Sequence, residues 1–408
     1  MASCRGADRR DATPATAVIR RRVHEEPPPR KFPRGALSVL ATLASATVAI
    51  LAWQSPSLPV RLTSADFWRL STSLSEPPGT FFSDNVVSNE LSYAQTVPHF
   101  RLLRRGGVYL GVGPEQNFTF ISAMEARLAI IVDIRRENLL LHLLYKALFE
   151  LSENRAAFLS RLFGRPPPPQ PMPDATARRL MDYYASVPGD ADLFSAHAAD
   201  LRRSVTAIHR FDLAGGDLAT LDRLHRLFFA HGPAVSYTST HNTRVPAPVT
   251  FAMLMSQADA HGSELSFLAT EQAYQFVRSL QVNNLIVPVV GNLAGPKAIR
   301  AVGAFLRASG ADVTAFYLSN VEDYLGKAPV PPNGQWSDFC ANVAALPIGE
   351  DSVFVRPLGL AWMSPDGRML VNTETTLGLP GSADKFVYNG PVLPTPMVQI
   401  LPEIRGCQ

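Results

Sequence analysis

The chain alternates between short, wholly apolar runs and amphipathic stretches, a pattern typical of buried parallel strands connected by helices. Residues 108–110, 128–133, 284–291 and 313–318 are rich in β-branched and aromatic side chains, which favours a strand in each. Residues 352–355 predict one more strand. Pro288 lies inside the third of these runs, and because proline cannot donate to a ladder, it suits the end of a strand or an edge strand better than a central position.

The connecting stretches predict helices of different kinds. Residues 139–145 are apolar on nearly every side, which indicates a helix buried against a sheet. Residues 174–235 predict three amphipathic helices, and 271–280 and 336–346 predict two more. Strands alternating with helices imply an α/β fold: a Rossmann-like, mostly parallel sheet with helices on both faces. Residues 165–262 form a helical insertion in this pattern.

The N-terminus departs from this pattern. Residues 1–34 contain nine Lys or Arg and four acids, a net +5 that leaves −2 for the rest of a chain of net +3. We interpret 1–34 as a disordered basic arm. Residues 35–53 are uncharged and as a helix would span roughly 28 Å, which predicts a single transmembrane helix in the lipid bilayer, or a signal anchor. A cleaved signal peptide is the alternative.

The remaining boundaries follow composition. Residues 54–61 predict a linker, 62–357 the Rossmann-like domain, and 358–408 a Pro/Gly-rich C-terminal segment that we do not assign. The basic arm predicts a membrane protein with a cytoplasmic N-terminus by the positive-inside rule. The main domain would then lie outside the cytoplasm, where adenosylmethionine is not expected. The side of the membrane therefore stays open.

The candidate chemistry lies at strand ends. After the strand at 108–110, Gly111 and Gly113 allow a tight turn and Pro114 suits a helix start, whose free N–H groups can bind a ligand. Asp133 ends the next strand at the spacing that places a carboxylate on ribose hydroxyls. Asn117 stands near the position of the third glycine of a dinucleotide fingerprint, which disfavours NAD or FAD. The alternative is an ordinary strand–turn–helix.

Two later loops add polar groups. Asn292 follows the strand at 284–291, and Ser319 follows the strand at 313–318. Carboxyl ends of parallel strands meet at one edge of a sheet, so we expect these groups to converge there. The predicted ligand-binding residues are Gly111, Gly113, Pro114, Glu115, Gln116, Asn117, Asp133, Asn292 and Ser319.

The order of these motifs resembles class I S-adenosylmethionine-dependent methyltransferases, and residues 109–119 and 287–297 also resemble an uncharacterised bacterial protein family with such a fold. The resemblance implies S-adenosylmethionine as cofactor. It would place Gly111 and Gly113 at its methionine part, Asp133 on the ribose and Asn292 on the adenine amine. Asn320 would lie near the transferred methyl. Methyl transfer sometimes needs a base, for which Glu322, Asp323 and Tyr317 are candidates, with solvated or packed residues as the alternative interpretation. The resemblance names no substrate.

Other functions are disfavoured. The folded part has no basic excess, so we expect no nucleic acid partner. No HExxH or CxxC spacing occurs, which disfavours a metal, and His142 is interpreted as a core histidine. The sequence contains neither a GxSxG elbow nor a P-loop. A Cys340–Cys407 bridge stays possible. Two functions remain: a membrane-anchored methyltransferase-like protein, and a non-enzymatic, membrane-tethered domain that binds an unknown small molecule.

Overall fold

The computed structural model describes residues 57–81, 84–237, 249–259, 261–325 and 334–355, and four short strands beyond them. In these residues we find no helix with the length and hydropathy that a membrane span requires. The predicted membrane segment 35–53 and the basic arm 1–34 lie outside the described residues, as does most of the C-terminal segment 358–408.

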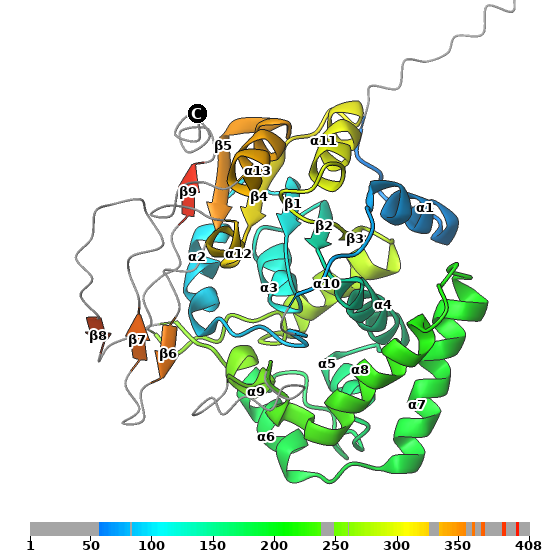
Figure 1. Cartoon of the computed structure of the whole chain (residues 1–408). Coiled ribbons are helices and arrows are strands. Elements are labelled where there is room, and N and C mark those ends of the chain that lie inside the picture. Colours follow the sequence, from blue (N-terminus) through cyan, green and yellow to red (C-terminus); the bar gives the residue numbers. More distant parts are fainter. Residues whose placement is uncertain are drawn as a thin grey trace, which may run out of the picture. The chain divides into compact units, whose positions relative to one another are not determined.

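A six-stranded sheet forms the centre of the fold, with the strand order β3-β2-β1-β4-β5-β9 (Figure 1). The first five strands are parallel, and β9 pairs antiparallel with β5. Order and direction confirm the predicted α/β fold with a mostly parallel sheet. The strand bounds are β1 Val108–Gly111, β2 Leu128–Asp133, β3 Ile286–Val290, β4 Val313–Tyr317, β5 Ile348–Val355 and β9 Met397–Gln399.

Burial explains the composition of these strands. Every residue of β1, β2, β3 and β4 is buried, which requires apolar side chains on both faces. β3 is an edge strand, which is one of the two positions that suit Pro288, so the missing N–H of this proline costs no ladder hydrogen bond. A separate antiparallel sheet contains β6 Ala361–Met363, β7 Met369–Val371 and β8 Phe386–Tyr388, which the sequence did not predict.

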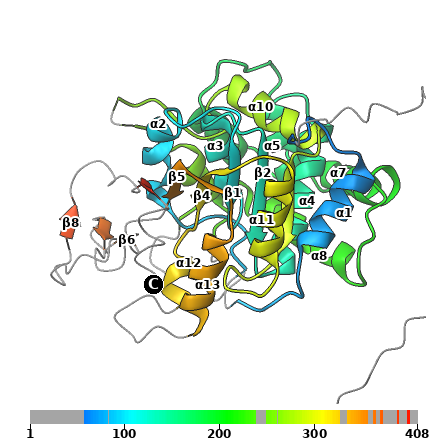
Figure 2. The same cartoon turned by 90° about the horizontal axis from the view of Figure 1, so that it is seen from above.

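Helices cover both faces of the sheet: α11 and α13 lie on one side, and α3 and α10 on the other (Figure 2). α1 packs against the edge strand β3 and against α11. The bounds of the helices around the sheet are α1 Ser64–Leu74, η1 Leu91–Thr96, α2 Val97–Phe100, α3 Gln116–Ala123, α4 Arg136–Leu151, α10 Glu271–Val282, α11 Ala298–Ala308, α12 Val321–Tyr324 and α13 Gly334–Ala344.

The remaining helices group beside α4, away from the sheet (Figure 1). They are α5 Arg155–Phe163, α6 Ala177–Ser186, α7 Ala191–Arg203, η2 Ser204–Ile208, α8 Asp217–His231, η3 Gly232–Ala234 and α9 Phe251–Met255. Residues 139–149 of α4 are all buried, because this helix separates the sheet from the insertion. The all-round apolar pattern predicted this position.

Candidate functional site

A cavity of about 330 Å³ opens where the carboxyl ends of β1, β2, β3 and β4 meet. The strand order reverses between β1 and β4, and such switch points are where doubly wound sheets bind ligands. The residues that line the cavity are Thr80, Phe81, Asn85, Ser88, Asn89, Val112, Gly113, Pro114, Gln116, Val132, Asp133, Ile134, Arg135, Gly291, Asn292, Leu293, Ser319, Asn320, Val321, Tyr324, Leu325 and Gln335. None of these lining residues comes from the helical insertion.

Asn117 holds the glycine loop, residues 111–114, by hydrogen bonds from its side chain. Its Nδ2 donates to the carbonyls of Val112, Gly113 and Pro114 at 3.0, 3.1 and 2.7 Å, and its Oδ1 accepts from the Tyr109 hydroxyl at 2.7 Å. Asn117 is fully buried and does not line the cavity. The third-glycine position is therefore filled by a side chain that fixes the shape of the loop.

Gly111 is also turned away from the cavity. A Cβ at this position would lie 2.1 Å from Asn117 Oδ1 and 2.6 Å from the Tyr109 ring, so glycine is required by packing under the loop. Gly113, at φ +81°, does line the cavity, as do Pro114 and Gln116. Gly111 is thus required by packing under the loop, whereas Gly113 lies on the side that faces the cavity.

Helix α3 begins at Gln116 with Glu115 at its N-cap, two residues later than Pro114 predicted. Glu115 is fully buried behind the cavity wall, where its Oε1 accepts the Ser88 N–H at 3.1 Å and its Oε2 has no partner among the described residues. Burial raises the pKa of Glu115 to about 7, although hydrogen bonds from its own N–H and that of Ser88 lower it. Glu115 is therefore a carboxyl next to the site whose ionised form is destabilised by burial.

The Glu115 carboxyl makes stability depend on pH. Its pKa is higher in the folded chain than in the unfolded chain, so ionisation costs folding energy as pH rises from about 4.5 to 7. We expect the unfolding free energy of Glu115→Gln, relative to wild type, to rise by about 3 kcal/mol between pH 4 and 8. Urea titrations at several pH values measure this difference.

The unfolding free energy of the variant must be compared with that of wild type at each pH, because buried histidines change stability with pH in the opposite direction. Burial lowers the pKa values of His142, His197 and His225 to about 4, so each adds stability as pH rises from 4 to 6.5. Both proteins retain these histidines, and their contribution cancels. A stability difference that does not change with pH would show that Glu115 is not held in a desolvating environment.

Asp133 lines the cavity but is not a free carboxylate. Arg135 donates its Nε to Asp133 Oδ1 at 3.0 Å and its Nη2 to Oδ2 at 2.9 Å, and both side chains are more than nine-tenths buried. The Arg135 guanidinium also donates to the Asp84 carbonyl, which fixes the loop before α2. The carboxylate keeps lone pairs for one ribose contact. Arg135 was not among the predicted site residues, and the only sign of its role in the sequence is its place two residues after a strand-ending acid.

Asn292 lines the cavity from the end of β3, and its Oδ1 accepts the Ala294 N–H at 3.0 Å. The N–H groups that begin α11 are occupied by Glu76, whose carboxylate accepts from Asn292, Lys297 and Ala298 at 2.8, 3.1 and 3.1 Å. Because an internal carboxylate already fills this helix N-terminus, the second glycine loop is not a phosphate site.

The end of β4 contributes a polar network. Ser319, at φ +50°, and Asn320 line the cavity, whereas Tyr317 and Glu322 are buried outside the set of lining residues. The Tyr317 hydroxyl donates to Glu90 Oε2 at 2.6 Å and accepts from Gln116 Nε2 at 3.2 Å.

Glu90 is a carboxyl of this network that was not among the predicted site residues. The Ser319 hydroxyl donates to its Oε1, which ties the segment before η1 to the end of β4. Burial raises the pKa of Glu90, while the bonds from Ser319 and Tyr317 lower it. A base in contact with a hydroxyl on the cavity wall can accept a proton from a bound molecule. No motif marks Glu90, because it meets β4 only in the folded chain.

Charge in the cavity wall is balanced. Among the described lining residues only Asp133 and Arg135 are charged, and they neutralise each other. The other polar groups are amides and hydroxyls, set among apolar side chains such as Leu293 and Val321. This wall suits a neutral or zwitterionic molecule, since it offers no spare cation for a phosphate.

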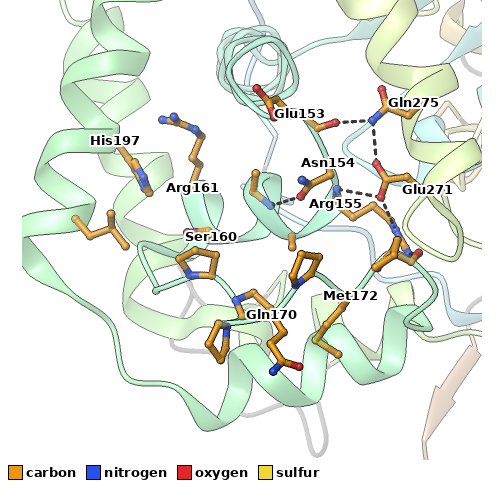
Figure 3. A pocket seen from close by; sticks show the side chains of 18 residues that line it. Glu153, Asn154, Arg155, Ser160, Arg161, Gln170, Met172, His197, Glu271 and Gln275 are labelled. Carbon is orange, nitrogen blue, oxygen red and sulfur yellow. Dashed lines mark hydrogen bonds and ion pairs between the residues drawn. The ribbon is translucent and has the colours of Figure 1, made fainter.

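A larger cavity, of about 850 Å³, lies between α5, α7 and a proline-rich segment at 167–173 (Figure 3). Gln275 donates to the Glu153 carbonyl and to Glu271, and Glu271 also accepts from Arg155. The carboxylates and guanidinium groups at this larger cavity are largely engaged in ion pairs, and no predicted site residue lines it. In the part of the chain that the structure describes, no three His, Cys, Asp or Glu side chains group as metal ligands.

A family model described as "Domain of unknown function (DUF7790)" matches residues 85–165 and 235–375, more than half of the chain. The two matched segments contain the glycine loop, β2, β3 and β4, and leave out residues 166–234, which contain α6, α7, η2, α8 and η3. No curated protein matches the chain. Because this family model matches more than half of the chain, the chain belongs to the DUF7790 family.

Proposed function

We propose that the cavity at the ends of β1 to β4 binds S-adenosylmethionine and that the protein is a methyltransferase of unknown substrate. The observation that carries the proposal is the convergence of Gly113, Asp133 and Asn292, from three strands, on one cavity at the switch point. Adenosylmethionine is a nucleoside without phosphate, so it needs no free cation from a wall whose two charges pair with each other. Methyl transfer needs mainly a positioned donor and acceptor.

The acceptor would enter beside Asn320 and Tyr324, where the lining residues carry no charge. Phe81 and Tyr324 stack edge to face at 5.1 Å there, and flat apolar surfaces of this kind hold small molecules well. If the acceptor is a hydroxyl, Ser319 and Glu90 form a path for its proton. A small, uncharged acceptor is the substrate class that this end of the cavity favours.

Calorimetry with the purified full-length chain tests the proposal. We expect saturable binding of S-adenosylmethionine and of S-adenosylhomocysteine, and at least tenfold weaker binding of ADP and NAD, because the described lining residues offer no free cation. Absence of heat with both adenosyl ligands would contradict the proposal. Equal binding of ADP would point to a nucleotide site instead.

A second candidate, a non-enzymatic ligand-binding domain outside the cytoplasm, is favoured by one observation. Cys340 is disulfide-bonded, and disulfides are typical of oxidising compartments. This agrees with an anchor at 35–53 whose basic flank stays in the cytoplasm, a topology that we keep as a proposal. Reporter fusions at the C-terminus distinguish the two: a cytoplasmic signal supports the enzyme, and an extracytoplasmic signal supports the binding domain.

A further inference from the structure

Four segments at the amino ends of β1, β2 and β3 form one surface, at the edge of the sheet opposite the cavity. We call this surface the amino edge. The Arg127 N–H donates to the Gly107 carbonyl at 3.0 Å, and its guanidinium donates to the Leu58 carbonyl at 2.9 Å. The Leu62 N–H donates to the Asn283 carbonyl at 3.0 Å. These bonds join the four segments of the amino edge, which are 58–62, 101–107, 125–127 and 282–284.

The amino edge sets exposed apolar side chains among arginines. Leu102 and Val60, 83% and 74% exposed, are the two most exposed large apolar side chains that the structure describes, and Val282 is exposed as well. The four segments contain one acid, Glu125, and five arginines, all of them exposed: Arg61, Arg101, Arg104, Arg105 and Arg127. Apolar side chains placed singly among basic ones suit a lipid surface, whereas a protein interface has an apolar core.

The charge of the amino edge is only partly balanced. Arg104 pairs with Asp312 and Arg105 with Glu125, and these ion pairs are well solvated. The other three arginines form no ion pair with a described residue. Two further acids, at positions 350 and 351, lie at the start of β5, beyond β4, and mark where the basic surface ends. The surface at β1 to β3 therefore favours an anionic partner.

The chain enters the domain at this same edge. Ser57 is the first residue that the structure describes, and Leu58, directly after it, is buried. Leu58 follows Trp53, the last residue of the proposed anchor, by five residues, and five extended residues span at most about 18 Å. In an anchored chain the amino edge is thus held within about 18 Å of the bilayer surface.

We propose that the amino edge rests on the bilayer that holds the anchor, with Leu102 and Val60 among the lipid headgroups and the arginines at anionic phosphates. The inference rests on the proposed anchor at 35–53 and not on the proposed cofactor. Each arginine near the surface adds attraction to anionic lipid, and the apolar side chains leave water. The cavity, at the opposite edge of the sheet, then faces the aqueous phase, and its ligands enter from water.

Photocrosslinking on the full chain, reconstituted in vesicles of phosphatidylcholine and phosphatidylglycerol, tests the proposal. We expect p-benzoylphenylalanine in place of Leu102 to form lipid adducts, detected by mass spectrometry, in at least tenfold higher yield than the same group in place of Tyr324. Tyr324 is the matched control, because it is also exposed, at 44%, but lies at the carboxyl edge beside the cavity.

Charge reversal tests the role of the arginines. We expect Arg61→Glu combined with Arg101→Glu to lower the yield of lipid adducts at position 102 at least threefold, and vesicles of phosphatidylcholine alone to have the same effect. Arg179→Glu combined with Arg226→Glu changes two exposed arginines of the helical insertion instead. This control should leave the yield at position 102 within 1.5-fold of that in the chain with native arginines.

Equal adduct yields at positions 102 and 324 would overturn the proposal, as would a yield at 102 that responds to neither charge reversal nor the removal of anionic lipid. Adducts from position 102 to a second copy of the chain, in place of lipid, would make the amino edge a dimer interface and would also overturn it. A full chain that does not float with the vesicles would remove the anchor on which the inference depends. Calorimetry with S-adenosylhomocysteine is independent of these outcomes, so the two proposals can fail separately.

Discussion

Arg155→Met is expected to lower the unfolding free energy by about 4 kcal/mol. Arg155 is 2% exposed, and its guanidinium donates to the carbonyls of Pro173, Ala175 and Leu268 at 2.6, 2.9 and 2.7 Å. It also donates to the Glu271 carboxylate at 3.2 Å. Methionine fills similar volume but leaves these acceptors without a donor, which urea denaturation will measure.

Arg69→Met is the matched control for this change. Arg69 pairs with Asp66 on an exposed face of α1, where both side chains are well solvated. We expect a change of about 0.5 kcal/mol or less, as is usual for surface pairs. Similar losses in both variants would mean that Arg155 does not hold the proline-rich segment to the start of α10.

Asp133→Ala is expected to have two effects. The unfolding free energy should fall by about 3–5 kcal/mol, because the buried Arg135 guanidinium loses its bidentate partner. Adenosine-type ligands should bind more weakly by about 1.5–3 kcal/mol, roughly 10- to 100-fold, if the carboxylate bonds the ribose. Denaturation and calorimetry at a temperature where the variant is folded measure the two effects.

Arg135→Met separates these effects. It removes the other half of the same pair, so the loss of stability should be similar, while the carboxylate that we assign to the ribose remains. We expect its affinity for S-adenosylhomocysteine to stay within threefold of wild type. Equal losses of affinity in both variants would assign the effect to damage of the loop rather than to a ribose contact.

Periodicity was sufficient to predict most of the fold. Runs such as 128–133 are buried on both faces, so their composition alone identifies them as central parallel strands. Pro288 disfavoured a central position for its strand, and β3 lies at an edge of the sheet. The strands after residue 358 were not predicted, since three-residue strands have too few positions to show a period.

The site was predicted less completely than the fold, for a physical reason. The sequence placed Gly113, Asp133, Asn292, Ser319 and Asn320 at strand ends, and these residues line one cavity. The partners that decide what each can do come from distant segments. Glu76 fills the start of α11 from more than 200 residues away, and Glu90 reaches the end of β4 from a comparable separation. Spacing within a motif carries no information about such contacts.

A crystal structure of the full chain with S-adenosylhomocysteine tests the central claim most directly. We expect the ligand in the cavity at the ends of β1 to β4, with ribose hydroxyls bonded to Asp133 and the base beside Asn292. A ligand bound elsewhere, for example along the proline-rich segment at 167–173, would contradict it, as would a cavity closed by its own side chains.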